Sequence, residues 1–319
     1  MSSFKRLLGT FVFLLSALSV SAGSANAASI PESPDPIKIA INEWTGQHLS
    51  AHIAGELLKK MGYNVEYITA GAVPQYAAIA QGNIHVEPEV WTNNVGDVYP
   101  KAIASGDIVD VGPLGLKPQE GWIYPPYMEE KCPGLPSYKA LYDCAQAFAL
   151  PETFPKGRLI TYPADWGTRS KELVEKTGLP FTAVAGGSEG AMVAELKSAY
   201  ATKQPILMMF WQPHWVFAEL DFNWVKWDGD GVNCDEANQS KGNACGFAQA
   251  TNPKVVWKGM EGKWPAAFKF MKAYTITNDI QNALILEVDE KGRKLEDVVK
   301  EWVDNNKSVW EPWVKAAQM

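Results

Sequence analysis

Apolar and polar residues alternate along the chain in blocks that predict strands followed by helices. The apolar run at residues 37–41 predicts a buried strand, and large apolar side chains then recur at helical spacing from Thr45 to Met61, before Gly62 ends the pattern. The alternation continues with predicted strands at 63–69, 84–90 and 109–112, and with predicted helices at 75–81 and 95–105. This order of elements predicts a mostly parallel sheet flanked by helices.

A second unit of the same kind begins after residue 150. Its predicted strands are 159–162, 181–185 and 206–211, and its predicted helices are 170–177 and 189–201. The Pro-rich stretch 117–126 predicts a first crossing, and a return near 247–256 places the helices 265–273 and 294–305 back on the first unit. We therefore expect an α/β protein of two lobes with a ligand cleft between them. The first lobe comprises residues 28–120 and 250–319, and the second comprises residues 121–249.

The first residues have the pattern of a secretory signal peptide. Lys5 and Arg6 precede an apolar run at 7–20, and small residues follow up to Ala25-Asn26-Ala27. The run is too short to span a membrane comfortably, and it leads into a cleavage-like site. We therefore expect residues 1–27 to be removed after Ala27 and the protein to function in the periplasm.

Export makes the four cysteines candidates for disulfides rather than free thiols. Four cysteines allow three pairings, of which the local one, Cys132 with Cys144 and Cys234 with Cys245, is the simplest. A zinc site is the alternative, but the chain has no C-x-x-C spacing that would favour it.

Composition excludes some classes of function. The chain has 29 Lys and Arg against 36 Asp and Glu, a formal charge of -7, which argues against binding to nucleic acid or to an anionic membrane. An apolar share of 46% excludes disorder by composition. Tryptophan is unusually frequent, with 13 residues in 319.

Four of these tryptophans lie at the ends of predicted strands or just after them: Trp44, Trp91, Trp166 and Trp211. Ligands of open α/β sheets bind beyond the carboxyl ends of the strands, so these four indoles, two from each lobe, are expected to face a ligand. An indole face attracts a methylated cation with about 0.5–2 kcal/mol per contact. Glu43 and Glu89 neighbour two of them and either add negative charge to the site or are solvated or paired elsewhere. The tryptophans expected to pack inside helical or terminal segments are Trp264, Trp302, Trp310 and Trp313.

Four segments together resemble one family of transport proteins. They are Ile37-Lys38-Ile39-Ala40, Val90-Trp91-Thr92, Asp165-Trp166-Gly167, and Phe210-Trp211-Gln212-Pro213-His214-Trp215, which is close to W-x-P-x-W. The chain resembles the substrate-binding proteins of glycine-betaine/proline-betaine ABC importers. The resemblance implies a two-lobed periplasmic-binding-protein fold of type II that closes on a small methylated amine, docks as a monomer on a membrane permease and carries out no catalysis. It also implies that Trp91, Trp166 and Trp211 form a tryptophan cage, which Trp44 extends in some members.

The resemblance also ranks the ligands. Some betaine binders have a histidine, which contacts the ligand carboxylate, where this chain has Val95. The backbone N–H groups of Gly167 and Thr168 could still contact a carboxylate. The missing histidine and the fourth indole favour trimethylamine N-oxide as the ligand. Glycine betaine and choline-type quaternary amines remain the alternatives.

Two other patterns indicate chemistry that the resemblance does not. Residues 186–190 match G-x-S-x-G, which would make Ser188 the nucleophile of a secreted hydrolase, but only His214 follows it, so we expect Ser188 to cap a helix. His48, His52 and Glu56 share a helix face and form either a metal stripe or an ordinary amphipathic face.

A Gly/Asp-rich segment offers candidate oxygen ligands for Ca²⁺. They are Asp228, Asp230 and Asn233. The segment does not match the twelve-residue EF-hand, and the alternative is a turn before Cys234. We expect no cofactor other than such a structural Ca²⁺.

Overall fold

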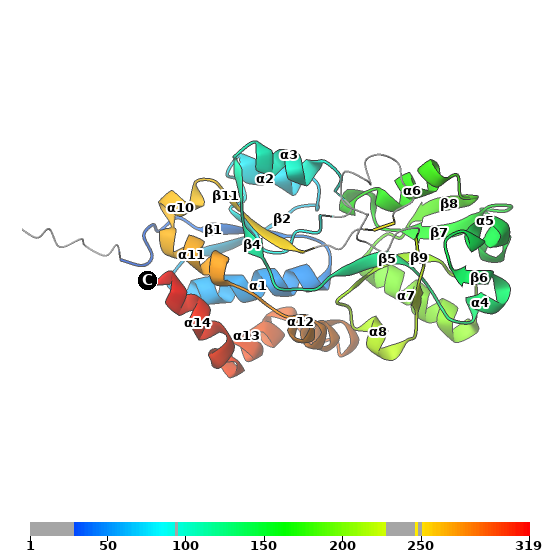
Figure 1. Cartoon of the computed structure of the whole chain (residues 1–319). Coiled ribbons are helices and arrows are strands. Elements are labelled where there is room, and N and C mark those ends of the chain that lie inside the picture. The colour runs from blue at the N-terminus through cyan, green and yellow to red at the C-terminus, as the bar shows by residue number, and fades with distance from the viewer. Residues whose placement is uncertain (1–28, 93–94, 228–245, 248–250) are drawn as a thin grey trace, which may run out of the picture.

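The computed structural model describes residues 29–92, 95–227, 246–247 and 251–319, which fold into two lobes arranged along one axis (Figure 1). Each lobe is built on a five-stranded sheet within these residues. The first sheet has the order β2-β1-β3-β11-β4, formed by β2 (Val65–Thr69), β1 (Ile37–Ile41), β3 (Val86–Glu87), β11 (Pro253–Trp257) and β4 (Ile108–Pro113). The second has the order β10-β5-β9-β7-β8, formed by β10 (Asn223–Trp224), β5 (Gln119–Tyr124), β9 (Met208–Gln212), β7 (Gly157–Thr161) and β8 (Phe181–Ala185).

The predicted parallel pairing is correct for one side of each sheet. β1 pairs in parallel with β2 and β3, and β7 pairs in parallel with β8 and β9. β11 and β5 run the other way, because β11 is antiparallel to β3 and β4, and β5 is antiparallel to β9 and β10. The two connecting segments lie side by side, since Leu114 N–H donates to Asn252 O over 2.9 Å.

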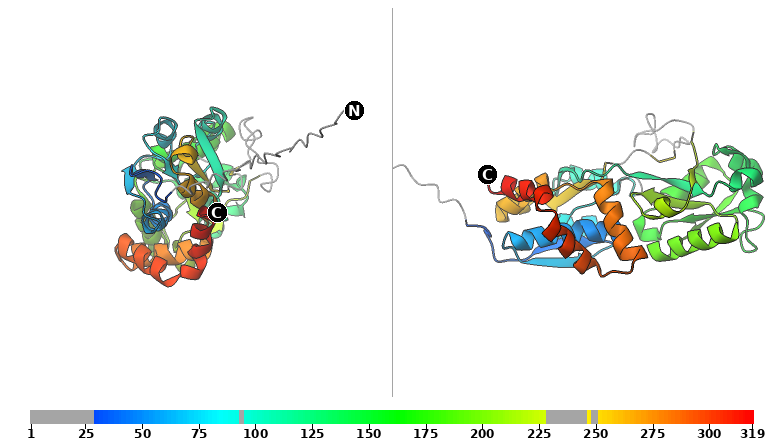
Figure 2. Two further views of the ribbon diagram at one scale, coloured as in Figure 1. Left: turned by 90° about the vertical axis from the view of Figure 1, so that its left-hand side faces the viewer. Right: turned by 90° about the horizontal axis from the view of Figure 1, so that it is seen from below.

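Helices cover the first sheet on both faces (Figures 1 and 2). They are α1 (Thr45–Lys60), α2 (Gln75–Ala80), α3 (Val98–Ala104), α10 (Met260–Lys263), α11 (Pro265–Ala273), α12 (Asn278–Ile285), the π-helix η3 (Leu286–Glu290), α13 (Leu295–Asn305) and α14 (Lys307–Ala317). The apolar stripe predicted for α1 is confirmed, because Leu49, Ile53 and Leu57 are fully buried. Burial of each such side chain contributes about 1.5–3 kcal/mol. The C-terminal helices return to the first lobe, as the second crossing predicts.

The second lobe carries helices and one further short strand around its sheet. They are α4 (Met128–Lys131), β6 (Pro133–Pro136), α5 (Ala140–Cys144), η1 (Ala145–Phe148), η2 (Ala164–Trp166), α6 (Arg169–Thr177), α7 (Glu189–Thr202) and α8 (Val216–Glu219). A disulfide joins Cys132 to Cys144, with the Cα atoms 5.2 Å apart, as the local pairing predicts. Cys234 and Cys245 lie outside the described residues.

Two sequence predictions about segment length are wrong. The strand predicted at 84–90 covers only Val86–Glu87, because Pro88 has no N–H group to continue the ladder. The helix predicted at 95–105 is shorter and spans Val98–Ala104. The four tryptophans predicted to pack in helical or terminal segments, Trp264, Trp302, Trp310 and Trp313, are buried.

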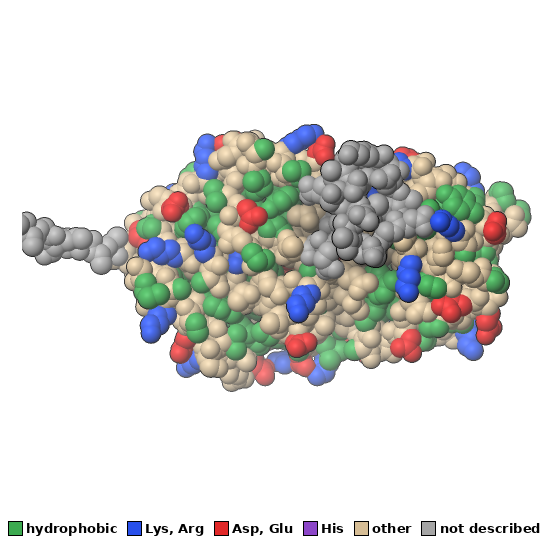
Figure 3. Space-filling model, in the orientation of Figure 1, with side chains coloured by type: hydrophobic (Ala, Val, Ile, Leu, Met, Phe, Trp, Pro, Cys, Tyr) green, Lys and Arg blue, Asp and Glu red, His purple; other side chains and the backbone are tan. Residues whose placement is uncertain are grey.

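The surface of the described residues mixes charges of both signs over the face shown in Figure 3. Among the described residues, no helix is both long enough and apolar enough to cross a membrane. The predicted signal peptide at residues 1–27 lies outside the described residues and stays a prediction.

Candidate functional site

One cavity lies where the two lobes meet, and all four strand-end tryptophans line it. Its walls are Trp44, Ala72 and Trp91 from the first lobe, Glu120 from β5 of the second sheet, and Tyr162, Trp166 and Trp211 from the second lobe. Trp44 lies between β1 and α1, and Trp166 ends the short helix η2 that follows β7. The structure therefore brings together four residues that are up to 167 positions apart, counted from Trp44 to Trp211.

Three of the indoles form consecutive walls of a box. The ring centroids of Trp44 and Trp166 are 5.1 Å apart with planes at 61°, and those of Trp166 and Trp211 are 5.8 Å apart at 77°. The Tyr162 ring lies 5.6 Å from Trp166 and 5.5 Å from Trp211. Walls that meet near a right angle surround a small volume with electron-rich faces, which is the arrangement that attracts a methylated ammonium group.

Glu89 holds two of the indoles from behind. Its Oε1 accepts N–H groups from Trp44 over 3.2 Å and from Trp91 over 2.9 Å. Its Oε2 accepts from Ser50 Oγ and from Gln281 Nε2, each over 2.6 Å. Burial raises the pKa of Glu89 above its usual value, and these four donors partly oppose that rise. The structure thus places Glu89 outside the cavity lining, where it fixes the orientation of the indoles.

Glu43 also contacts an indole edge rather than the cavity. It is exposed on the first lobe, and its Oε2 accepts the Trp166 Nε1–H of the second lobe over 3.3 Å. Gly167 and Thr168 lie on a neighbouring depression together with Lys171 and Ala185, and they are not among the residues that line the tryptophan cavity.

Three lining residues, Ala72, Glu120 and Tyr162, were not predicted from the sequence. The Tyr162 hydroxyl donates to Glu120 Oε1 over 3.0 Å, and Glu120 pairs with Trp211 across the β5–β9 ladder. Burial raises the pKa of Tyr162 well above its usual value, so the phenol keeps its proton. Tyr162 directly follows β7, so the strand-end rule could have found it. Glu120 gave no such signal, because its segment was predicted as a crossing.

The structure contradicts the interpretation of Ser188 as a hydrolase nucleophile and of His48 and His52 as metal ligands. Ser188 Oγ accepts the N–H of Ala191 over 3.3 Å and caps α7, as predicted. His214, the only histidine downstream, is 3.2 Å from Glu189 and not paired with Ser188. His48 Nε2 is bonded to the Asn42 carbonyl over 2.6 Å, and His52 stacks on Tyr67 at 4.1 Å, where burial lowers its pKa to about 4.

One cluster of ligand-type side chains does occur in the described part of the chain. Single atoms of Glu189, His214 and Asp289 lie within 4.8 Å of one another. The cluster joins the two lobes, since Asp289 belongs to η3 and the other two belong to the second lobe. The predicted Ca²⁺ ligands Asp228, Asp230 and Asn233 lie outside the described residues, and that site stays a prediction.

Comparison with known proteins gives consistent matches. The family described as "Substrate binding domain of ABC-type glycine betaine transport system" matches residues 35–305. A trimethylamine N-oxide-binding protein of Pelagibacter ubique is 31% identical over 315 residues, which are 95% of this chain and 99% of that protein.

Two solved structures share the fold. Lactococcal OpuAC in its closed-liganded conformation with glycine betaine aligns with a TM-score of 0.70 and 19% identity, over 88% of this chain and 100% of the other. An ABC-transporter choline binding protein in complex with choline aligns with a TM-score of 0.74 and 18% identity, over 89% and 93% of the two chains.

Proposed function

Because the chain belongs to the family of substrate-binding domains of ABC-type glycine betaine transport systems, we propose that its own substrate is trimethylamine N-oxide. Members of this family bind small quaternary amines and work with an ABC transporter permease, so the protein is a transport component and not an enzyme. In our proposal the protein acts as a monomer in the periplasm, captures the N-oxide by closing its lobes and delivers it to the permease.

The observation that carries the proposal is the indole box between the lobes. Trp44 and Trp166, from different lobes, are 5.1 Å apart, so the box is compact and complete only when the lobes meet. Several faces at about 0.5–2 kcal/mol each support micromolar binding of one trimethylated nitrogen. The Pelagibacter ubique relative, which matches this chain over 99% of its own length, is a trimethylamine N-oxide-binding protein. This match supports the N-oxide as the ligand.

The polar lining argues against a ligand that carries a carboxylate. Glu120 is the acidic group on the cavity wall, and a carboxylate held beside it would be repelled. Val95, at the position where some betaine binders have a histidine, is buried in an apolar cluster with Tyr76 and Ile79 and offers no donor. Trimethylamine N-oxide has its negative oxygen directly on the positive nitrogen, so the nitrogen offsets more of this repulsion than it does for a carboxylate one carbon further away.

Choline is the second candidate, and Glu120 is the observation that favours it. Choline is a full cation with a hydroxyl group, so the carboxylate would attract its charge and accept its O–H. Choline is also longer than the N-oxide, because a two-carbon arm separates its hydroxyl from the nitrogen. The compact box therefore favours the N-oxide, and the carboxylate favours choline.

Calorimetric titration of the protein with trimethylamine N-oxide, choline and glycine betaine tests the proposal. We expect the N-oxide to bind most tightly and glycine betaine most weakly. Tighter binding of choline would transfer the assignment to the second candidate. Glycine betaine binding at least as tightly as the N-oxide would overturn the argument from Glu120, and heat from none of the three would overturn the amine class.

A further inference from the structure

Helix α1 begins at the cage and has no capping side chain of its own. Its N-cap residue is Trp44, whose side chain makes no cap hydrogen bond, and its first turn contains no acidic residue. The first N–H groups of a helix need acceptors from outside the helix, and the helix dipole makes that end positive. The start of α1 therefore favours an acceptor, preferably a negatively charged one.

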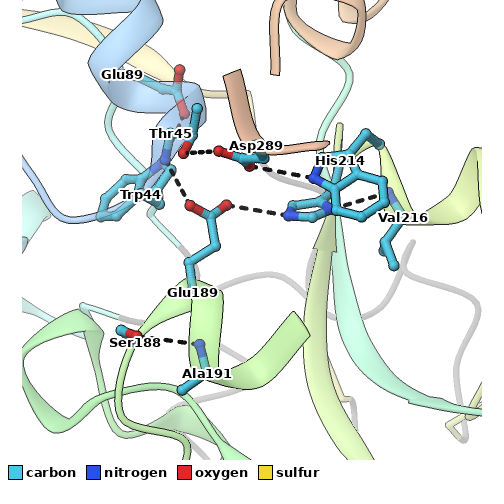
Figure 4. A network of polar contacts seen from close by, with 10 residues as sticks. Trp44, Thr45, Glu89, Ser188, Glu189, Ala191, His214, Val216 and Asp289 are labelled. Carbon is cyan, nitrogen blue, oxygen red and sulfur yellow. Dashed lines mark hydrogen bonds and ion pairs between the residues drawn. The ribbon is translucent and has the colours of Figure 1, made fainter. Parts of the chain in front are cut away.

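The acceptor comes from the other lobe. Glu189 is the first residue of α7 in the second lobe, and its Oε2 accepts the backbone N–H of Thr45 over 2.8 Å (Figure 4). Thr45 is the first residue of α1 and directly follows Trp44. A hydrogen bond from a backbone N–H to a carboxylate is charge-assisted and stronger than a neutral one. Glu189 is only 7% exposed in this arrangement.

His214 lies beside the Glu189 carboxylate. The His214 Nδ1 accepts the N–H of Val216 over 3.2 Å, so the neutral ring carries its proton on Nε2. That Nε2 lies 3.2 Å from Glu189 Oε1 without forming a hydrogen bond, whereas Glu189 Oε2 is hydrogen-bonded to Thr45. The same tautomer argues against a metal ion in the cluster, because a ligating Nε2 would need a lone pair, with the proton on Nδ1.

Asp289 adds a second connection at the same place. Its Oδ1 accepts the Thr45 hydroxyl over 2.7 Å, and its Oδ2 accepts the Trp215 Nε1–H of the second lobe over 3.3 Å. Figure 4 shows the Glu189 and Asp289 carboxylates directed toward Thr45 from different elements. Both connections end at the residue that follows a wall of the indole box.

We propose that Glu189 is a positioning residue that caps helix α1 across the cleft and thereby couples lobe closure to assembly of the indole box. When the lobes close, the Glu189 carboxylate accepts the Thr45 N–H, and Trp44 is held against Trp166. This contact exists only while the lobes are together, so it stabilises the closed, ligand-retaining state and not either lobe alone. The inference rests on the substrate-binding role of the chain but not on which amine is bound.

The first test replaces the carboxylate. Glu189→Ala should raise the ligand dissociation rate about tenfold, while the association rate changes less than about twofold. The melting temperature of the ligand-free protein should stay within about 1 °C, because the contact is made only in the closed state. Glu189→Gln, which keeps an acceptor without the charge, should fall between the wild type and Glu189→Ala. Stopped-flow tryptophan fluorescence gives the rates, using whichever amine binds the wild type most tightly.

A control on the same helix separates closure from general damage. Glu195 is also on α7, but it pairs with Arg158 inside the second lobe. Glu195→Gln should leave the dissociation rate unchanged. An unchanged dissociation rate in Glu189→Ala, an equal change in Glu195→Gln, or a fall in ligand-free melting temperature that parallels the affinity loss would overturn the proposal.

A second variant removes the donor instead of the acceptor. Trp44 has φ -124° and ψ 147°, the extended conformation that precedes proline, and the first position of a helix accepts proline. Thr45→Pro deletes the N–H and also the hydroxyl, and Thr45→Val deletes only the hydroxyl whose hydrogen bond Asp289 accepts. We expect Glu189→Ala to add little to Thr45→Pro but to keep its full effect on Thr45→Val. Full additivity with Thr45→Pro would contradict the cross-lobe cap.

The metal alternative has its own outcome in the same assay. Zn²⁺ should leave the wild-type dissociation rate unchanged if the cluster acts through hydrogen bonds. If Zn²⁺ slowed ligand dissociation in the wild type but not in His214→Ala, a bridging cation would be present. That result would overturn the interpretation that the cluster acts through hydrogen bonds.

Discussion

At the scale of single residues, the buried Glu89 carboxylate outside the cavity fixes the orientation of two cage indoles. Glu89 accepts four hydrogen bonds, two of them from Trp44 and Trp91. An indole whose N–H is held by a carboxylate keeps one orientation, so the ligand does not have to order it. The effect resembles preorganisation of a binding site, in which the ordering cost is met before the ligand arrives.

Replacing Glu89 with glutamine should therefore weaken binding without removing any ring. The amide has a single oxygen, so at least one of the four donors would face an N–H group and lose its acceptor. An unsatisfied buried donor costs about 1–3 kcal/mol, which predicts an affinity loss of about tenfold or more in calorimetry. Glu66→Gln on the exposed face of β2 is the control and should have no effect. Wild-type affinity in Glu89→Gln would show that the carboxylate does not fix the cage.

Trp91 gives a direct test of the cage itself. Trp91→Ala removes one wall, and we expect a loss of about 0.5–2 kcal/mol from the cation–π contact plus the loss of ring contacts with the methyl groups. Trp257 is a matched control, since it is also half-buried but lies at the end of β11, outside the cavity lining. If Trp257→Ala lowered affinity as much as Trp91→Ala, the effect would come from stability and not from the cage.

The strand-end rule located the tryptophans because their ring chemistry and their place after strands are both visible in the sequence. It failed for Glu120, because that residue lies near the start of β5 and reaches the cavity only through the antiparallel pairing of β5 with β9. Strand direction is not encoded in the apolar pattern, so no periodicity argument could have placed Glu120 beside Trp211.

At the scale of elements, local sequence signals predicted the bounds of helices where tertiary contacts did not change them. The caps and apolar stripes of α7 and α11 gave bounds close to those observed. The short β3 and the reversed β11 depended on Pro88 and on the return crossing, which the pattern of apolar residues does not report. The sequence therefore predicts the existence of elements better than their direction.

The disulfide of the second lobe provides a prediction at this scale. Cys132 directly follows α4 and Cys144 ends α5, so the bond closes a short loop at the outer end of the second lobe (Figure 1). A variant with alanine at both positions should lose about 2–3 kcal/mol in chemical denaturation, because the unfolded chain regains loop entropy. Calorimetry on the same variant should give wild-type affinity below its melting temperature. A lower affinity at full folding would mean that this loop supports the cage.

At the scale of the whole molecule, the proposed closure depends on contacts between the lobes that no local sequence pattern predicts. Thr45 and Glu189 are 144 positions apart and meet only because two lobes close on each other. Two polar residues with no shared motif carry no signal in a single sequence. The two-lobed fold could be predicted from the repeated alternation of strands and helices, whereas the lobe–lobe connections required the coordinates.

Closure should also respond to pH through Asp289. Desolvation and the charge of Glu189 raise its pKa from an ordinary value of 3.8 to about 6, while Thr45, His214 and Trp215 oppose that rise. In the open arrangement Asp289 is separated from Glu189, so its pKa there lies nearer the ordinary value. The closed state therefore binds a proton more tightly, and lowering the pH through about 6 stabilises closure.

The direction of this pH effect on affinity distinguishes Asp289 from the other charged groups nearby. Lys197 pairs with Glu290 and Glu219 on the exposed rim, and the hydrogen bond to Glu290 raises the pKa of Lys197, so its ammonium group keeps its charge across the range used. Affinity should rise about twofold from pH 7.5 to pH 5.5, a small change because Asp289 is exposed on one side and solvent screens its charge. Asp289→Asn should abolish this dependence, because the amide carries no proton to exchange. An affinity that falls on acidification in the wild type, or an unchanged pH profile in Asp289→Asn, would exclude Asp289 as the group that links protons to closure.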